Sequence, residues 1–163
     1  MPPTEPRPAG DEPWIIRLRP ARDPAAFHAA VSRLAAAARA RVAEVTVCLD
    51  VAESHAPEAD LQAVAGPLGQ LLDAACAAAA APAPRGESPT LREVVVTTID
   101  TGDALEIEVA DSAADPSRQR AAVADLRPLV ERAGWGLSLA ACPDGGTAVT
   151  LRIPRRRGRS IAA

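Results

Sequence analysis

Apolar and polar residues alternate, strictly or in part, in several short stretches of the chain, and this alternation predicts β-strands. The clearest stretches are LREVVVTTID and ALEIEVA. The turn Thr101-Gly102-Asp103 separates them and predicts an antiparallel hairpin. A second hairpin is predicted around the turn Pro143-Asp144-Gly145-Gly146. The predicted strands are residues 14–19, 45–51, 91–100, 104–110, 135–141 and 147–153.

Elsewhere apolar residues recur every three or four positions, a spacing typical of helices. The predicted helices are residues 23–42, 60–80 and 121–133. Asp23 and Pro24 are suited to be the N-cap and the first residue of the first helix. Gly66-Pro67 predicts a break or kink near the start of the second, and residues 111–120 are predicted to form a polar loop. The buried face of the third helix is predicted to carry Val123, Leu126, Leu129 and Val130.

The resulting order, β-α-β-α-β-β-α-β-β, places strands in pairs between helices. This order predicts the α+β class: a two-layer sandwich in which a mixed, mostly antiparallel sheet of about five or more strands carries about three helices on one face. We expect a single domain at residues 13–154, preceded by a proline-rich, disordered lead-in at 1–12. Residues 155–163 form a basic tail with the sequence RRRGRSIAA, expected to be solvated.

Composition removes several function classes. The 163-residue chain contains 18 basic residues, all of them arginine, so lysine Schiff-base chemistry and a phosphate-binding P-loop lysine are excluded. A net charge of −3 argues against nucleic acid as a partner. Cys48, Cys76 and Cys142 lack metal-ligand spacing and are expected to be small buried residues in a reducing compartment. With neither a signal peptide nor a membrane span, the sequence predicts a cytoplasmic protein without a metal site.

Four segments of the chain then point to a known family. LGQLLDAACAAAA begins at Leu68, EIEVADSAAD at Glu106, DLRPLVERAGW at Asp125 and GGTAVTLRIP at Gly145. In this order they resemble the N-box helix, the first glycine box, the helix before the His-Gly-Gly corner and the Gly-Thr ending of the ATP-binding domain of sensor histidine kinases. That domain belongs to the GHKL superfamily, which has the Bergerat fold. The resemblance covers residues 14–154.

The resemblance implies a nucleotide pocket in which some positions match and others do not. Asp111 takes the place of the aspartate that reads the adenine amino group, and Thr147 is the threonine of the Gly-Thr ending. Ala74 falls where the family has its magnesium-binding asparagine, and a methyl group cannot supply the oxygen ligand that Mg²⁺ needs. Gln70 falls at the position of the general-base carboxylate, and an amide cannot take a proton.

The glycine boxes are altered as well. Ala113 and Asp115 occupy the two glycine positions, where side chains would obstruct a nucleotide and Asp115 would repel its phosphates. The family places a lid and a second glycine-rich phosphate loop between Asp111 and the next helix, and residues 112–120 contain no Gly-x-Gly. We therefore expect a vestigial pocket made of Gln70, Ala74, Asp111, Ala113, Asp115 and Thr147, with neither catalytic residues nor a bound cofactor.

These departures predict a degenerate histidine-kinase-type ATPase domain that acts as a regulatory or protein-interaction module in bacterial signalling. Its partners are expected to be proteins of a signalling pathway, and self-association stays open. One alternative is a nucleotide-binding kinase domain of the histidine-kinase or anti-sigma type with an atypical pocket for ATP and Mg²⁺, supported by Asp111. Another is a histidine-phosphotransferase-like adaptor. Against it, His28 is interpreted as an ordinary helical histidine, because no helical hairpin precedes the first predicted strand.

Overall fold

A computed structural model describes residues 22–42, 44–82 and 91–155. The predicted strand 14–19, the lead-in 1–12 and the tail after Arg155 lie outside these described residues. The elements are α1 (Pro24–Arg41), β1 (Thr46–Asp50), α2 (Leu61–Ala79), β2 (Glu93–Asp100), β3 (Ala104–Asp111), α3 (Ser117–Arg132), β4 (Gly136–Ala141) and β5 (Thr147–Pro154).

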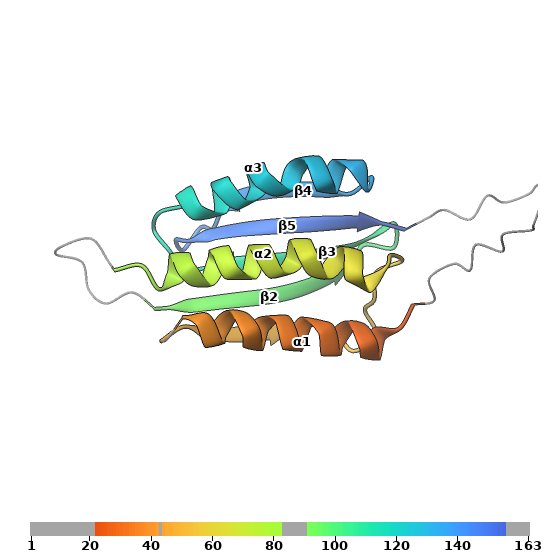
Figure 1. Cartoon of the computed structure of the whole chain (residues 1–163), viewed down its shortest axis with the longest axis horizontal. Helices are drawn as coiled ribbons and strands as arrows, with labels where there is room; N and C mark the ends of the chain where they lie inside the picture. Colours follow the sequence, from red (N-terminus) through yellow and green to blue (C-terminus); the bar gives the residue numbers. More distant parts are fainter. Residues whose placement is uncertain (1–21, 43, 83–90, 156–163) are drawn as a thin grey trace, which may run out of the picture.

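The five described strands form one mixed sheet in the order β1-β2-β3-β5-β4. β1 is parallel to β2, whereas the pairs β2–β3, β3–β5 and β4–β5 are antiparallel. The three helices lie side by side in a second layer, on one face of this sheet (Figure 1). The predicted α+β two-layer sandwich is therefore confirmed.

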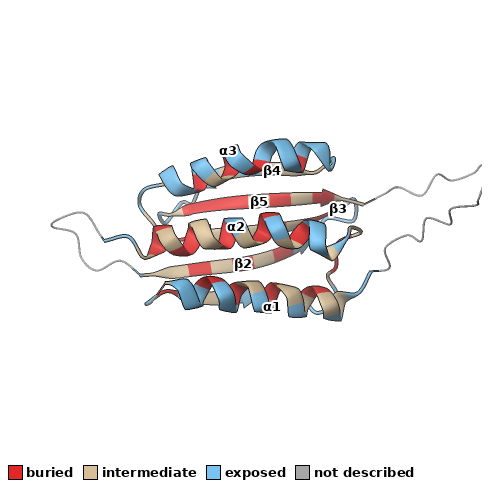
Figure 2. Cartoon of the chain, viewed as in Figure 1, coloured by how far each residue is buried: buried red, intermediate tan, exposed pale blue. Residues whose placement is uncertain are grey.

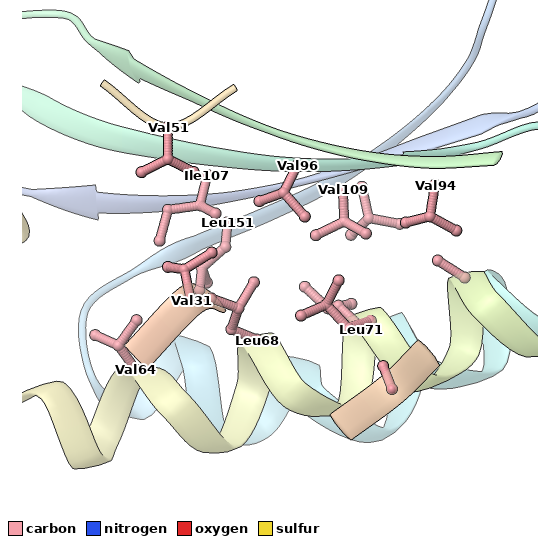
Figure 3. Packing of buried hydrophobic residues seen from close by; sticks show 14 of the residues in the cluster. Val31, Val51, Val64, Leu68, Leu71, Val94, Val96, Ile107, Val109 and Leu151 are labelled. Carbon is pink, nitrogen blue, oxygen red and sulfur yellow. The ribbon is translucent and has the colours of Figure 1, made fainter. Parts of the chain in front are cut away.

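Alternation along the strands decides which face of the sheet the helices cover. On β2, Val94 and Val96 are fully buried, whereas the intervening Val95 is only half-buried. The same alternation buries Ile107 on β3 and Leu151 on β5. Figure 3 shows these side chains pointing from the sheet toward the helices. Burial of such aliphatic side chains provides the main driving force for joining the two layers.

The helices contribute the other half of the core. α1 begins as predicted: Oδ1 of Asp23 accepts a hydrogen bond from the backbone N–H of Ala26 at 2.9 Å, and Pro24 is the first helical residue. Phe27 on α1 and Leu72 on α2 are buried among the largest side chains of the core. α2 is the central helix and is buried along most of its length, as Figure 2 shows.

Four details of the prediction are wrong. α3 begins at Ser117, so the second half of the predicted loop 111–120 is helical. Leu129 does not belong to the buried face of α3, since 46% of its surface is exposed. Pro67 does not break α2, which runs through it from Leu61 to Ala79. β5 extends one residue beyond the predicted strand 147–153, to Pro154, which pairs with Ala104.

Candidate functional site

Asp111 is the buried carboxylate at the end of β3. Its backbone pairs with Val94 of β2 on one side and Thr147 of β5 on the other, and its side chain faces the helix layer with only 5% of the residue exposed. Alternation along β3 produces this placement, because Asp111 continues the buried series of Ile107 and Val109. The sheet therefore carries a carboxylate into the interior at the level of the first turn of α3.

Both oxygens of this carboxylate have partners within the chain. Oδ1 accepts a hydrogen bond from the backbone N–H of Ala113 at 2.8 Å, closing a turn just after the strand. Oδ2 accepts a hydrogen bond from the side-chain amide of Gln119, the third residue of α3. Gln119 is itself only 2% exposed, and its Oε1 is buried without a hydrogen-bond partner among the described residues.

Burial controls the ionisation of Asp111. Removal of the carboxylate from water raises the pKa of Asp111, and the hydrogen bonds from Ala113 and Gln119 lower it by less than burial raises it. The thiol of Cys76 on α2 is fully buried, and burial raises its pKa, with further increases from the charges of Asp73 and Asp111. The charge of Asp111 therefore acts across the interior on α2, and no basic side chain compensates it in the described part of the chain.

Thr147 lies beside Asp111 on the neighbouring strand and is 3% exposed. The backbone before Thr147 must pass very close to Asp111. Gly146 has a φ of +93°, and a Cβ atom at this position would lie 1.9 Å from the carbonyl oxygen of Asp111. Only glycine fits there, so the Gly-Thr pair fixes the β4–β5 turn against the end of β3.

Asp115 has a structural role at the start of α3. Its side chain accepts hydrogen bonds from the backbone N–H of Ser117 at 3.0 Å and from the Ser117 hydroxyl at 2.8 Å. These bonds lower the pKa of Asp115, with the Ser117 hydroxyl as the largest cause. Residues 112–116 form the whole connection from β3 to α3. Five residues leave no room for a lid or for a second phosphate loop.

The two remaining predicted positions lie on α2. Gly69 approaches Leu34 of α1, and Ala74, five residues later, lies about 140° further round the helix, on the flank toward α3. Ala74 is half-buried and presents a methyl group to this side. Gln70 is exposed and lines a shallow cavity of about 210 Å³ between α1 and α2, together with Arg41 and Asp73.

The structure thus brings three of the six predicted residues together, namely Asp111, Ala113 and Thr147. Asp115 binds Ser117 at the start of α3, and the hydrogen-bond partners of the Asp111 side chain among the described residues are Ala113 and Gln119, not Gln70 or Ala74. Sequence reasoning missed Gln119, the direct partner of the carboxylate, because residues 111–120 were interpreted as a loop. A signal was present: extending the buried positions Val123, Leu126 and Val130 back by one turn reaches residue 119.

The part of the chain that the structure describes contains neither a candidate metal site nor a candidate membrane-spanning helix. There is no group of three or more His, Cys, Asp or Glu side chains arranged to hold a metal ion. No helix in these ranges has the length and apolar character needed to cross a membrane.

Comparison with known proteins identifies the fold. No protein-family model matches the sequence, and no curated protein matches it either. Solved structures do match. The catalytic domain of histidine kinase ThkA aligns with a TM-score of 0.62 at 14% identity, over 78% of this chain and 92% of that domain. The ATP-binding domain of PrrB from Mycobacterium tuberculosis aligns with a TM-score of 0.56 at 19% identity, over 77% and 91%.

A longer protein gives the same result. Histidine kinase AdeS from Acinetobacter baumannii aligns with a TM-score of 0.63 at 13% identity, over 80% of this chain and 66% of that protein. At such identities the likeness establishes the fold alone. The chain has the fold of the catalytic ATP-binding domains of sensor histidine kinases, as its four motif segments predicted.

Proposed function

We propose that this chain is a degenerate histidine-kinase-type ATPase domain that does not turn over ATP and serves as a regulatory or protein-interaction module in bacterial signalling. The observation that carries the proposal is the hydrogen bond between Gln119 and Asp111. In the family resemblance, Asp111 is the residue that reads the amino group of adenine. Here the amide of Gln119 supplies that N–H donor from within the chain.

The packing around the pair supports the same conclusion. α3 starts directly after the five-residue connection and packs against α2. Gln119 reaches Asp111 from the first turn of α3, so a nucleotide base could approach the carboxylate only if this turn moved away. Displacing Gln119 would break a buried hydrogen bond to a charged group, a cost of roughly 1.5–3 kcal/mol before any nucleotide contact forms.

The phosphate end of the pocket lacks its chemistry. Mg²⁺ held against phosphates requires an oxygen ligand from the protein, and α2 offers the methyl group of Ala74 at that position. Asp115 places a carboxylate at a glycine position and is engaged by Ser117. These residues do not fit a magnesium–nucleotide complex.

One observation favours the alternative of a nucleotide-binding domain with an atypical pocket. Asp111 is a buried carboxylate with a raised pKa, and burying such a group in an apolar interior lowers the stability of the fold. Its retention would be explained if a nucleotide displaced Gln119. The two functions differ in whether ATP stabilises the folded chain.

Thermal unfolding and a turnover assay test the proposal. We expect neither the full chain nor the double variant Ala74→Asn/Gln70→Glu to show a rise in melting temperature with Mg·ATP or to release phosphate. The double variant restores the magnesium ligand and the base, but it does not restore the glycine backbone or the lid. Phosphate release above the no-protein blank in either chain would refute the loss of function and favour the alternative.

A further inference from the structure

The face of the sheet opposite the helices carries a pattern of its own. Strand register places small apolar residues side by side across all five described strands, forming what we call the apolar row. The apolar row consists of Cys48, Val95, Ala110, Ala148 and Ala140. No described helix packs on this face, which lies behind the strands in Figure 1.

Acidic residues surround the apolar row. The neighbouring row across the sheet includes Asp50 on β1 and Glu108 on β3, while Glu93 and Glu106 lie on the same face. Glu93 accepts a hydrogen bond from the Cys48 thiol at 3.3 Å. Among the described residues, neither Asp50 nor Glu108 forms an ion pair. We call these four side chains and the apolar row the acidic face.

One arginine already binds at the border of this face. Arg152 of β5 is the one basic residue in the described strands of the sheet. Its guanidinium contacts Asp103 at 2.7 Å and Glu106 at 3.4 Å. Three residues later the chain leaves β5 at Arg155, whose backbone N–H donates to the carbonyl of Asp103 at 2.7 Å. Arg155 also forms an ion pair with Asp100. The basic tail therefore starts beside the β2–β3 turn, at one end of the acidic face.

We propose that the C-terminal segment, residues 156–163, binds across the acidic face of the same molecule. Its sequence RRGRSIAA carries Arg156, Arg157 and Arg159, whose guanidinium groups match carboxylates in charge and in forked geometry. Ile161 and the two alanines that follow are small enough for the apolar row. A cavity of about 380 Å³ lined by Val95, Ala110 and Cys142 lies at the far end of this path.

The length of the segment agrees with this path. Eight extended residues span roughly 26 Å. From the level of Ala104, where β5 ends, to Ala110 the sheet extends six residues along β3, or roughly 20 Å. The segment must first turn back after Arg155, which lies at the level of Asp103, so its arginines lie near Glu106 and residues 161–163 extend toward Glu108 and Ala110. Tethering also gives the segment a local concentration in the millimolar range, which a separate basic peptide would have to exceed.

Nuclear magnetic resonance tests this proposal by comparing the spectrum of the full chain with that of a chain truncated after Arg155. We expect the truncation to move the backbone amide signals of Val95, Glu108, Ala110 and Thr150, and these differences to be lost in 1 M NaCl. Full-length Arg156→Gln/Arg157→Gln/Arg159→Gln should give the same shifts without shortening the chain. Asp50→Arg/Glu108→Arg should remove the difference between full and truncated chains, whereas Asp125→Arg, exposed on α3, should retain it.

Two results would overturn the proposal. The first is a change confined to the neighbours of the cut, such as Arg152 and Asp103. The second is a set of shifts on the acidic face that weakens on tenfold dilution, because that would assign the face to the tail of a second copy. Shifts that do not depend on protein concentration, and that disappear when the tail arginines or the carboxylates of the acidic face are replaced, support binding within one molecule.

Discussion

The side-chain amide of Gln119 donates a hydrogen bond to the buried carboxylate of Asp111, and so joins the first turn of α3 to the end of β3. The pair is unequal in its bonding. Asp111 accepts two hydrogen bonds, whereas the Oε1 atom of Gln119 is buried with no partner in the described residues. A buried anion and an orphaned acceptor therefore lie side by side, an arrangement that leaves stability to be gained.

Replacing Asp111 by Asn should stabilise the protein at neutral pH. The change removes the buried charge, and the hydrogen bond to residue 119 is kept because the new NH₂ group can donate to the Gln119 oxygen after the Gln119 amide rotates by 180°. We expect the free energy of unfolding to rise by about 1–2 kcal/mol in urea denaturation at pH 7. In a Gln119→Leu background the carboxylate lacks one of its two hydrogen-bond donors, so Asp111→Asn should there be stabilising by at least as much. A loss of stability in the single variant would contradict the assigned roles.

The advantage of Asp111→Asn should depend on pH. Since the folded pKa of Asp111 is raised, the folded wild type binds its proton more tightly than the unfolded chain does. The stability contributed by protonated Asp111 is fully present below about pH 3.9, the ordinary pKa of an aspartate side chain. It falls as pH rises through the folded pKa of Asp111. We therefore expect the difference between the variant and the wild type to grow from pH 3 to pH 7. A difference that shrinks with pH would mean that the folded pKa is lowered.

Gly146→Ala should be strongly destabilising, because the new methyl group would meet the carbonyl oxygen of Asp111 at 1.9 Å on a backbone with φ of +93°. We expect a loss of roughly 2–5 kcal/mol in chemical denaturation. Gly66→Ala is the matched control, since Gly66 is exposed within α2 and a Cβ there meets nothing within 4 Å. That variant should change the free energy of unfolding by less than about 1 kcal/mol, because the helix propensity of alanine is offset by the restriction that Pro67 places on the preceding residue. Equal effects at the two sites would rule out the close approach at Gly146.

The two leucines Leu72 and Leu129 should differ sharply in their contribution to stability. Leu72 of α2 is fully buried, and truncation to alanine should cost roughly 2–5 kcal/mol. Leu129 of α3 is 46% exposed, so Leu129→Ala should change the free energy of unfolding by less than about 1 kcal/mol. Urea titrations of both variants measure this. A cost at Leu129 as large as that at Leu72 would mean that α3 is rotated about its axis so that Leu129 faces the core.

Most of the fold could be predicted because each layer has a simple periodicity. Val94 and Val96 against Val95 identify β2 as a half-buried strand, and Gly102 identifies its hairpin. The error at α3 has a physical reason. Its first turn, Ser-Arg-Gln-Arg, is polar, and the residue that faces inward there is Gln119, so apolar periodicity begins only at Val123. Leu129 was assigned to the core because hydrophobicity alone does not fix the rotation of a short helix.

The candidate site could be predicted only in part. Asp111 and Thr147 follow from their motif positions at strand ends, and the structure pairs them across β3 and β5. The role of Asp115 could not be predicted from its substitution for a glycine, because its function depends on where α3 begins. Once the helix starts at Ser117, the side chain of Asp115 accepts hydrogen bonds from the backbone N–H and the hydroxyl of that first residue. The partner of Asp111 likewise depends on that boundary.

Isothermal titration of the full chain with Mg·ATP and with Mg·ADP tests the central claim most directly, because the claim is that Gln119 occupies the hydrogen-bonding position of Asp111 and that the phosphate contacts are absent. We predict no saturable binding tighter than about 1 mM, for the wild type and for Asp111→Ala alike. Micromolar binding by the wild type that Asp111→Ala abolishes would contradict the account and show that a nucleotide displaces Gln119.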